Sequence, residues 1–158
     1  MKNNKLVIIL LTILIILISI IIVLLVSIKD KETFKIPDFD KEISVIPDSL
    51  NYEKSVLNIL NGYSVYISPN PKMVDDNYLK IDFVSVKTNS VYVKVRIFDK
   101  MGNVIGETGL LKPGDYLEKV KLNKNLEVND GLTYKIMGYD KDTYISAGSV
   151  SLSTKVGE

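Results

Sequence analysis

The chain has 158 residues, with 20 lysines and arginines against 19 aspartates and glutamates, and it contains no histidine, cysteine or tryptophan. This length allows one domain of ordinary size, and the balanced charge argues against a nucleic-acid-binding protein, which needs a basic face. The chain also lacks the residues of a Ser-His-Asp site, the usual zinc ligands and a glycine-rich phosphate loop. We therefore expect no enzyme, no catalytic residue and no cofactor.

Residues 6–26 are leucine, isoleucine and valine, interrupted only by Thr12 and Ser19. A helix over this range is about 32 Å long, which matches a hydrocarbon core of about 30 Å. A cleaved signal peptide, the alternative, has a shorter apolar core and a small-residue cleavage site. We therefore predict a cytoplasmic tail at residues 1–5 and a transmembrane helix at residues 6–28 that remains as a signal anchor.

Lysines flank this segment on both sides, so the positive-inside rule does not give its direction. A short tail stays inside easily while a domain is translocated, and we expect a single-pass protein of the cell membrane with its C-terminal domain extracytoplasmic. Thr12 and Ser19 share one helix face. Their hydroxyls either bond to their own backbone or join two helices.

Residues 29–54 are predicted to form a stalk. Two Ile-Pro-Asp triplets, at residues 36–38 and 46–48, favour extended backbone, and charges of alternating sign surround the first. Phe34 and Phe39 are more apolar than a free linker needs. They dock on the following domain, lie at the lipid surface or contact a partner.

Residues 55–158 are predicted to form a domain of short β-strands, because apolar residues alternate with period two. Asn-Gly at residues 61–62 predicts a hairpin over 55–67, with a short helix over 50–60 as the alternative. Further strands are predicted over residues 79–84, 91–98, 104–111, 116–122, 132–139 and 144–154. Gly106 and Gly109 weaken the strand over 104–111 and suggest a bulge or a sheet edge.

Regularly spaced turn signals indicate a β-sandwich or a barrel. Residues 130–136 resemble the entry to the sixth strand of immunoglobulin-like domains, where a tyrosine hydroxyl bonds to backbone at the strand corner. The predicted fold class is therefore all-β: an immunoglobulin-like β-sandwich preceded by one N-terminal transmembrane helix. Tyr134 would be the structural tyrosine corner. The alternative is that Tyr134 merely faces the core.

Three further stretches point to a family. They are Gly-Glu-Thr-Gly-Leu-Leu-Lys-Pro-Gly-Asp-Tyr at residues 106–116, Met-Gly-Tyr at 137–139 and Tyr-Ile-Ser-Ala-Gly-Ser-Val at 144–150. Together they resemble small signal-anchored proteins of low-GC Gram-positive bacteria, often encoded on conjugative or other mobile elements. The resemblance covers roughly residues 62–154. It implies an envelope accessory role beside a transfer channel or surface structure, and it supplies no catalytic residues.

Aspartates recur in the predicted turns and at strand ends: Asp75, Asp76, Asp99, Asp130, Asp140 and Asp142. Asp140 and Asp142, joined by Asp99 or Asp130 at one end of a sandwich, would offer the oxygen ligands that Ca²⁺ prefers. Solvated turn aspartates explain the same residues, and there is no EF-hand-like loop. We therefore predict no metal site.

The candidate partner contacts are Tyr92, Phe98, Met137 and Tyr139, which lie on the outward-facing sides of two predicted strands. If these strands are neighbours, the four residues form an apolar patch beside basic side chains, and such patches usually mark contact surfaces. The alternatives are that the stalk phenylalanines cover the patch, or that these are scattered surface residues.

The sequence thus predicts a membrane-anchored, non-enzymatic interaction or assembly module at the Gram-positive cell surface, accessory to a conjugative-transfer or other envelope machine. Its expected partners are the membrane and an envelope protein, and no nucleic acid. One alternative is a subunit of a surface fibre or pilus-like assembly, although the apolar segment lacks a preceding leader-cleavage glycine and an internal glutamate. The other is a glycan-binding domain, although tryptophan, the commonest sugar platform, is absent.

Overall fold

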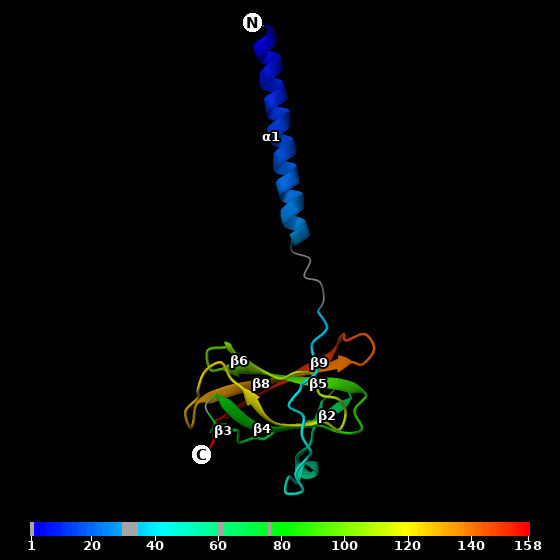
Figure 1. Ribbon diagram of the computed structural model, residues 1–158, viewed down its shortest axis with the longest axis vertical. Coiled ribbons are helices and arrows are strands. Elements are labelled where there is room, and N and C mark those ends of the chain that lie inside the picture. Colours follow the sequence, from blue (N-terminus) through cyan, green and yellow to red (C-terminus); the bar gives the residue numbers. More distant parts are fainter. Residues whose placement is uncertain (1, 30–34, 60–61, 76) are drawn as a thin grey trace. The chain divides into compact units, whose positions relative to one another are not determined.

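The computed structural model describes residues 2–29, 35–59, 62–75 and 77–158, and it contains two compact units, Met1–Lys35 and Ile36–Glu158. The first unit is built on one helix, α1 (Lys2–Lys29), shown in Figure 1. Thr12 Oγ1 donates to the backbone oxygens of Ile8 and Ile9, and Ser19 Oγ donates to that of Ile16 at 2.8 Å. Both hydroxyls therefore bond to their own helix, which was the first of the two alternatives.

Among the side chains that the structure describes, which in α1 are those of residues 7–22, no helix is both long and apolar enough to cross a membrane.

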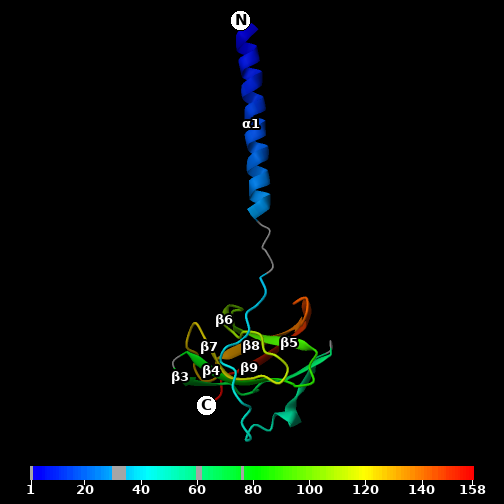
Figure 2. The same cartoon turned by 45° about the vertical axis from the view of Figure 1, so that its right-hand side comes forward.

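The second unit consists of two antiparallel sheets that lie face to face (Figures 1 and 2). The first sheet contains β1 (Leu57–Ile59), β2 (Tyr63–Tyr66), β3 (Lys72–Asp75), β4 (Tyr78–Ser85) and β7 (Tyr116–Lys121). The second, in the order β6-β5-β8-β9, contains β5 (Val91–Asp99), β6 (Val104–Glu107), β8 (Gly131–Asp140) and β9 (Ser146–Lys155). β7 lies along one edge of β4, so β2 and β3 share the other edge. The prediction of an all-β domain after one N-terminal helix is confirmed.

The core lies between the sheets and is made by every second residue of the long strands. The buried positions include Leu79, Ile81 and Phe83 of β4, Val91, Val93, Val95 and Ile97 of β5, and Leu132, Tyr134 and Ile136 of β8. Each fully buried aliphatic side chain contributes about 1.5–3 kcal/mol. The period-two pattern that predicted these strands is thus the pattern that fills the core, and it leaves the intervening residues on the outer faces.

Among the local predictions, the first hairpin is present and several others need correction. The hairpin over residues 55–67 is present as β1 and β2, with Gly62 at φ +88°, while residues 60–61 of its turn lie outside the described residues. The helix over 50–60 reduces to one 3₁₀ turn, η1 (Tyr52–Ser55). The strand over 104–111 is too long, because β6 ends at Glu107. β3 was not predicted, since Pro69 and Pro71 directly precede it.

The compact unit begins at Ile36, so it includes residues 36–54, which were predicted as part of the stalk. Asp40 N donates to Leu110 O at 3.0 Å, Leu110 N donates to Asp38 O at 2.9 Å, and Ser44 N donates to Tyr116 O at 3.0 Å. Residues 36–46, hereafter the docked segment, therefore join the domain through isolated β-bridges at Phe39 and Ser44. Phe34 lies outside the described residues.

Candidate functional site

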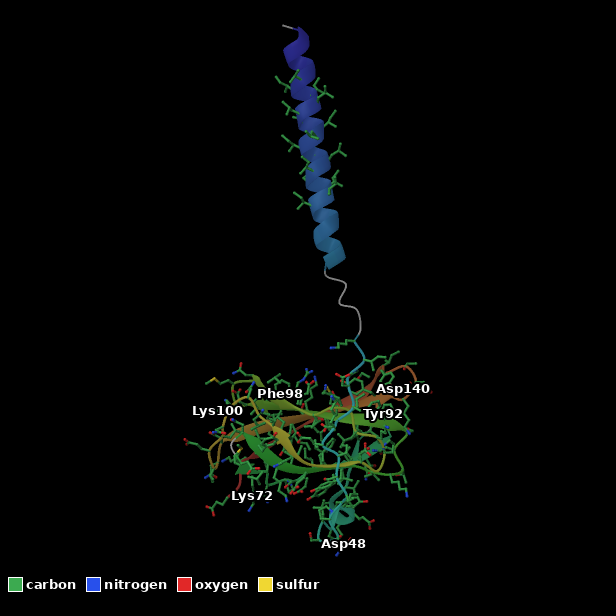
Figure 3. The ribbon with its side chains drawn as sticks, in the orientation of Figure 1. Asp48, Lys72, Tyr92, Phe98, Lys100 and Asp140 are labelled. Carbon is green, nitrogen blue, oxygen red and sulfur yellow. The ribbon has the colours of Figure 1, made fainter. Side chains whose placement is uncertain are left out.

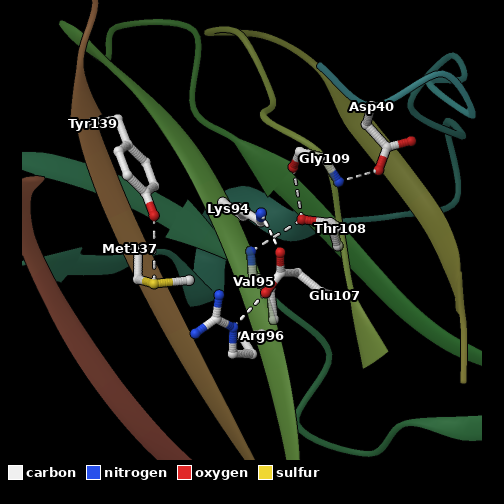
Figure 4. A network of polar contacts seen from close by, with 9 residues as sticks. All are labelled: Asp40, Lys94, Val95, Arg96, Glu107, Thr108, Gly109, Met137 and Tyr139. Carbon is white, nitrogen blue, oxygen red and sulfur yellow. Dashed lines mark hydrogen bonds and ion pairs between the residues drawn. The ribbon is translucent and has the colours of Figure 1, made fainter. Parts of the chain in front are cut away.

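The register of β5 and β8 brings three of the four predicted contact residues together. Tyr92 lies directly opposite Tyr139, and Lys94 lies opposite Met137. Tyr139 Oη donates to Met137 Sδ at 3.7 Å (Figure 4). The condition on which the patch depended, that the two strands are neighbours, is therefore met.

Phe98 does not join them. It lies six positions beyond Tyr92 on β5, or about 20 Å along a strand, and its cross-strand neighbours are Thr133 and Val104. Figure 3 shows Tyr92 and Phe98 at opposite ends of the sheet. The sequence prediction placed both on one face correctly but overlooked their separation along it.

Two further aromatic rings complete the site. The Phe39 ring of the docked segment packs edge-on against Tyr92, with centroids 4.9 Å apart and an interplanar angle of 83°. The centroid of the Tyr144 ring lies 5.9 Å from that of Tyr92, and the two rings are tilted by 35°. We call Phe39, Tyr92, Met137, Tyr139 and Tyr144 the aromatic patch. Phe39 matches the alternative that stalk residues cover part of this surface.

Tyr144 lies in the turn between β8 and β9, not in the strand predicted over 144–154. Its φ is +56°, its N–H donates to Asp140 O at 3.0 Å, and Asp140 N donates to Ile145 O. This is a hairpin closed by a G1 bulge, whose first residue is usually glycine. A tyrosine there costs about 1–2 kcal/mol, and the next side chain, Ile145, is 66 % exposed. Strain and exposure both oppose stability, so folding alone does not explain this turn.

Two basic residues beside the patch, Lys94 and Arg96, are paired. A third, Lys112, places its Nζ 5.0 Å from the centroid of the Phe39 ring. Glu107 of β6 forms ion pairs with both Lys94 and Arg96 (Figure 4), although only 8 % of Lys94 is exposed. Burial opposes ionisation of Glu107, but the hydrogen bonds and charges of the two basic groups outweigh it, and its pKa lies below the usual value. Burial raises the pKa of Tyr139. The patch itself holds no charged side chain, and the cluster beside it, with two basic groups on one carboxylate, keeps one net positive charge.

A short hydrogen-bond chain fixes the docked segment next to the patch. Val95 N donates to Thr108 Oγ1 at 3.0 Å, Thr108 Oγ1 donates to Gly109 O at 2.8 Å, and Gly109 N donates to Asp40 Oδ2 at 2.7 Å. A Cβ on Gly109 would lie 2.3 Å from Asp40 N, so only glycine permits this approach. Glycine at position 109 is thus structurally required, but because the docked segment packs closely against its backbone and not because of a bulge.

The aspartates do not converge. Asp140 lies opposite Val91 and Asp99 lies opposite Leu132, at the two ends of β5. Asp140 Oδ1 accepts hydrogen bonds from the turn that follows it, and these hold its pKa below the usual value. Asp99 accepts bonds from its own turn and from Lys124 Nζ at 2.8 Å. The described part of the chain holds no group of three or more potential metal ligands. Asp140 and Asp99 lie at opposite ends of β5 and do not form the shared calcium site that was considered as an alternative.

Tyr134 is buried, but its hydroxyl has no hydrogen-bond partner among the described residues. Burial raises the pKa of this hydroxyl, as does the nearby Asp82 carboxylate. The hydrogen bond that defines a tyrosine corner is therefore missing from the described part of the chain, and Tyr134 faces the core.

No protein-family model matches the chain, and no curated protein or solved structure is significantly similar to it.

Proposed function

We propose that this protein is a membrane-anchored, non-enzymatic interaction module whose aromatic patch binds another protein of a Gram-positive cell envelope. The proposal includes an immunoglobulin-like topology for the domain. Its support is the strand order: β6-β5-β8-β9 faces a sheet centred on β4 and β7, as the C′-C-F-G sheet of such domains faces their A-B-E strands.

The anchor in this proposal is α1. Its support is the composition of residues 6–26, which offers lipid an apolar surface on every face. The large apolar side chains of residues 7–22 are each about half exposed on the helix, from 48 % for Ile18 to 63 % for Ile15. A hydrocarbon environment removes that surface from water. The proposal includes a single-pass arrangement with the domain extracytoplasmic, supported by the short N-terminal segment, which stays inside easily while a domain is translocated.

The observation that carries the contact function is the concentration of uncharged aromatic surface around the strained β8–β9 turn. Tyrosine is enriched in protein interfaces, and the patch holds three tyrosines, of which Tyr92 and Tyr139 lie on adjoining strands and Tyr144 lies in the turn. Met137 is only 9 % exposed and contributes little of this surface. Ile145 adds an aliphatic side chain that is 66 % exposed next to the ring of Tyr144. A protein partner that buries this turn gains apolar area that the domain itself leaves open.

The test uses Ile145→Asp in the full chain, because Ile145 contributes mainly exposed surface and the substitution should leave the fold intact. Val45→Asp is the matched control, since Val45 is 89 % exposed and its neighbour Ser44 pairs with the first sheet rather than with β5 or β8. We expect Ile145→Asp to lose a protein that co-purifies from the native membrane with wild type and with Val45→Asp. Equal recovery with both variants would refute the proposed contact site.

A further inference from the structure

β9 presents an edge with which no strand of the described residues pairs. It pairs with β8, and the backbone hydrogen bond from Val156 N to Asp130 O fixes the phase of this pairing. Because bonded and non-bonded pairs alternate in an antiparallel ladder, Ser149, Ser151 and Ser153 turn their N–H and C=O groups away from β8. In the described part of the chain no backbone group outside β8 pairs with these three residues.

The other sheet edges of the described structure are protected in ways that β9 is not. β1, β3 and β6 have only three or four residues each; β3 also contains a register shift, and a bridge from Gly106 to Leu122 ties β6 to the first sheet. Ser44 of the docked segment covers the start of β7. β9 has ten residues, a regular register from Ser149 to Lys155, no proline, and no charge before Lys155. Natural sheets rarely leave such an edge unpaired.

We propose that β9 pairs antiparallel with β9 of a second copy, around a two-fold axis at Ser151, and so joins two four-stranded sheets into one. In this register Ser151 faces its own counterpart and Ser149 faces Ser153 of the second copy. Each such pair exchanges backbone hydrogen bonds in both directions. Lys155 falls opposite Ala147, so no like charges meet across the edge. The strand is therefore complementary to itself, as a two-fold interface requires.

The surface beside β9 fits the same occupant. An apolar crevice of about 330 Å³ opens between the two sheets, lined by Leu57, Tyr66, Ile67, Pro69 and Leu152 among others. The inward-facing residues of the added strand, Val150 and Leu152 of the second copy, come to this side of the sheet. A second copy thus places the aliphatic side chains of its Val150 and Leu152 beside the apolar crevice, while its serines face the serines of β9 across the shared edge.

The position of the docked segment also agrees with a second copy. The two-fold axis is perpendicular to the sheet, so both outer faces point the same way. Each chain enters its domain on that face, because Phe39 packs on the outward-facing ring of Tyr92. Two chains entering from one side can be anchored in one membrane; this step alone rests on the proposed function of α1.

Single cysteines test the register in the full-length protein in detergent, because the chain has no cysteine of its own. With Ser151→Cys, the paired Cα atoms lie about 5.5 Å apart, within the range of a disulfide. With Ser153→Cys, four residues along the strand separate each cysteine from its counterpart, about 13 Å. We expect mild oxidation to cross-link Ser151→Cys, and a mixture of Ser149→Cys with Ser153→Cys, but not Ser153→Cys alone. Equal cross-linking at 151 and 153, or none at 151, would overturn the proposal.

A proline variant separates this interface from any association through α1. Ser151→Pro removes an N–H that faces the free edge and keeps the pairing with β8, whereas Ser151→Ala keeps the backbone unchanged. By light scattering with detergent correction, wild type and Ser151→Ala should be dimers and Ser151→Pro a monomer. A monomeric wild type, or a dimeric Ser151→Pro, would contradict the proposal. Ile145→Asp should cross-link normally through Ser151→Cys, so the partner contact and the dimer can fail independently.

Discussion

Gly109→Ala is the most direct test of whether the docked segment is part of the domain. The new Cβ would lie 2.3 Å from Asp40 N, 2.5 Å from Asp40 Cα and 2.7 Å from Phe39 C. All three are backbone atoms, so no side-chain rotation relieves the overlap. The docked segment must move away from Gly109, and the contacts that hold it must lengthen or break.

The size of the effect follows from those contacts. Three hydrogen bonds of 2.7–3.0 Å join Asp38 and Asp40 to Gly109 and Leu110, and each contributes about 1 kcal/mol net. The edge-on contact of Phe39 with Tyr92 adds about 0.5–1.5 kcal/mol. Alanine also restricts the unfolded chain, which offsets about 0.4–1 kcal/mol. We expect Gly109→Ala to lower the free energy of unfolding by about 2–4 kcal/mol.

The assay is urea unfolding of the full chain, followed by circular dichroism and by tyrosine fluorescence. Gly131→Ala is the matched control, because the nearest atom to its Cβ would be Lys100 Cβ at 4.0 Å. It should leave stability unchanged or raise it by up to about 1 kcal/mol, because alanine restricts the unfolded chain without clashing with any atom in the fold. If Gly109→Ala costs no more than Gly131→Ala, the docked segment contributes nothing to the fold and the reasoning fails.

Two further pairs of variants probe the interior. Glu107→Gln leaves Lys94, which is 8 % exposed, without its counter-charge and should lower the free energy of unfolding by about 3 kcal/mol. Its control is Glu118→Gln, at a carboxylate that is 51 % exposed, which should lower it by less than about 1 kcal/mol. Similar urea midpoints for the two variants would contradict this prediction. Tyr134→Phe removes a buried hydroxyl without a partner in the described chain and should be neutral or stabilise by about 1 kcal/mol. Tyr116→Phe loses a 2.6 Å bond to Asp82 and should cost about 1.5 kcal/mol. A lower melting temperature for Tyr134→Phe than for Tyr116→Phe would show that the Tyr134 hydroxyl is bonded after all.

The strands that form the site could be predicted because their information is local. The alternating valines of β5 and the alternating apolar residues of β8 predict both that each segment is a strand and to which face of the sheet each side chain points. Tyr92 and Tyr139 therefore came out on the outer face correctly. The prediction that these two residues meet needed one assumption, that their strands are neighbours. Phe98 was included wrongly because the side of the sheet to which a residue points gives no information about its distance along the strand.

The docked segment could not be predicted in the same way. Its charges and prolines are those of a linker, and its contacts are long-range: Asp40 and Gly109 are 69 positions apart in the sequence. Glu107 was missed for a similar reason, since it reaches Lys94 and Arg96 from another strand. Tyr144 was misplaced because the bulge that ends the turn is normally marked by glycine, and here a tyrosine occupies it.

The docked segment, the aromatic patch and the β9 edge share one geometric consequence. The patch lies on the outer face of the sheet that β9 borders, and Phe39 brings the incoming chain to the same face. Pairing through β9 therefore places two patches and two chain entries on one side of a continuous sheet. A single patch of five residues offers a partner little area, but a partner long enough to reach both patches gains from the effective concentration of the second contact. The strained turn at Tyr144 is then part of a bivalent surface. The binding free energies of its two copies add, so their contributions to the binding constant multiply.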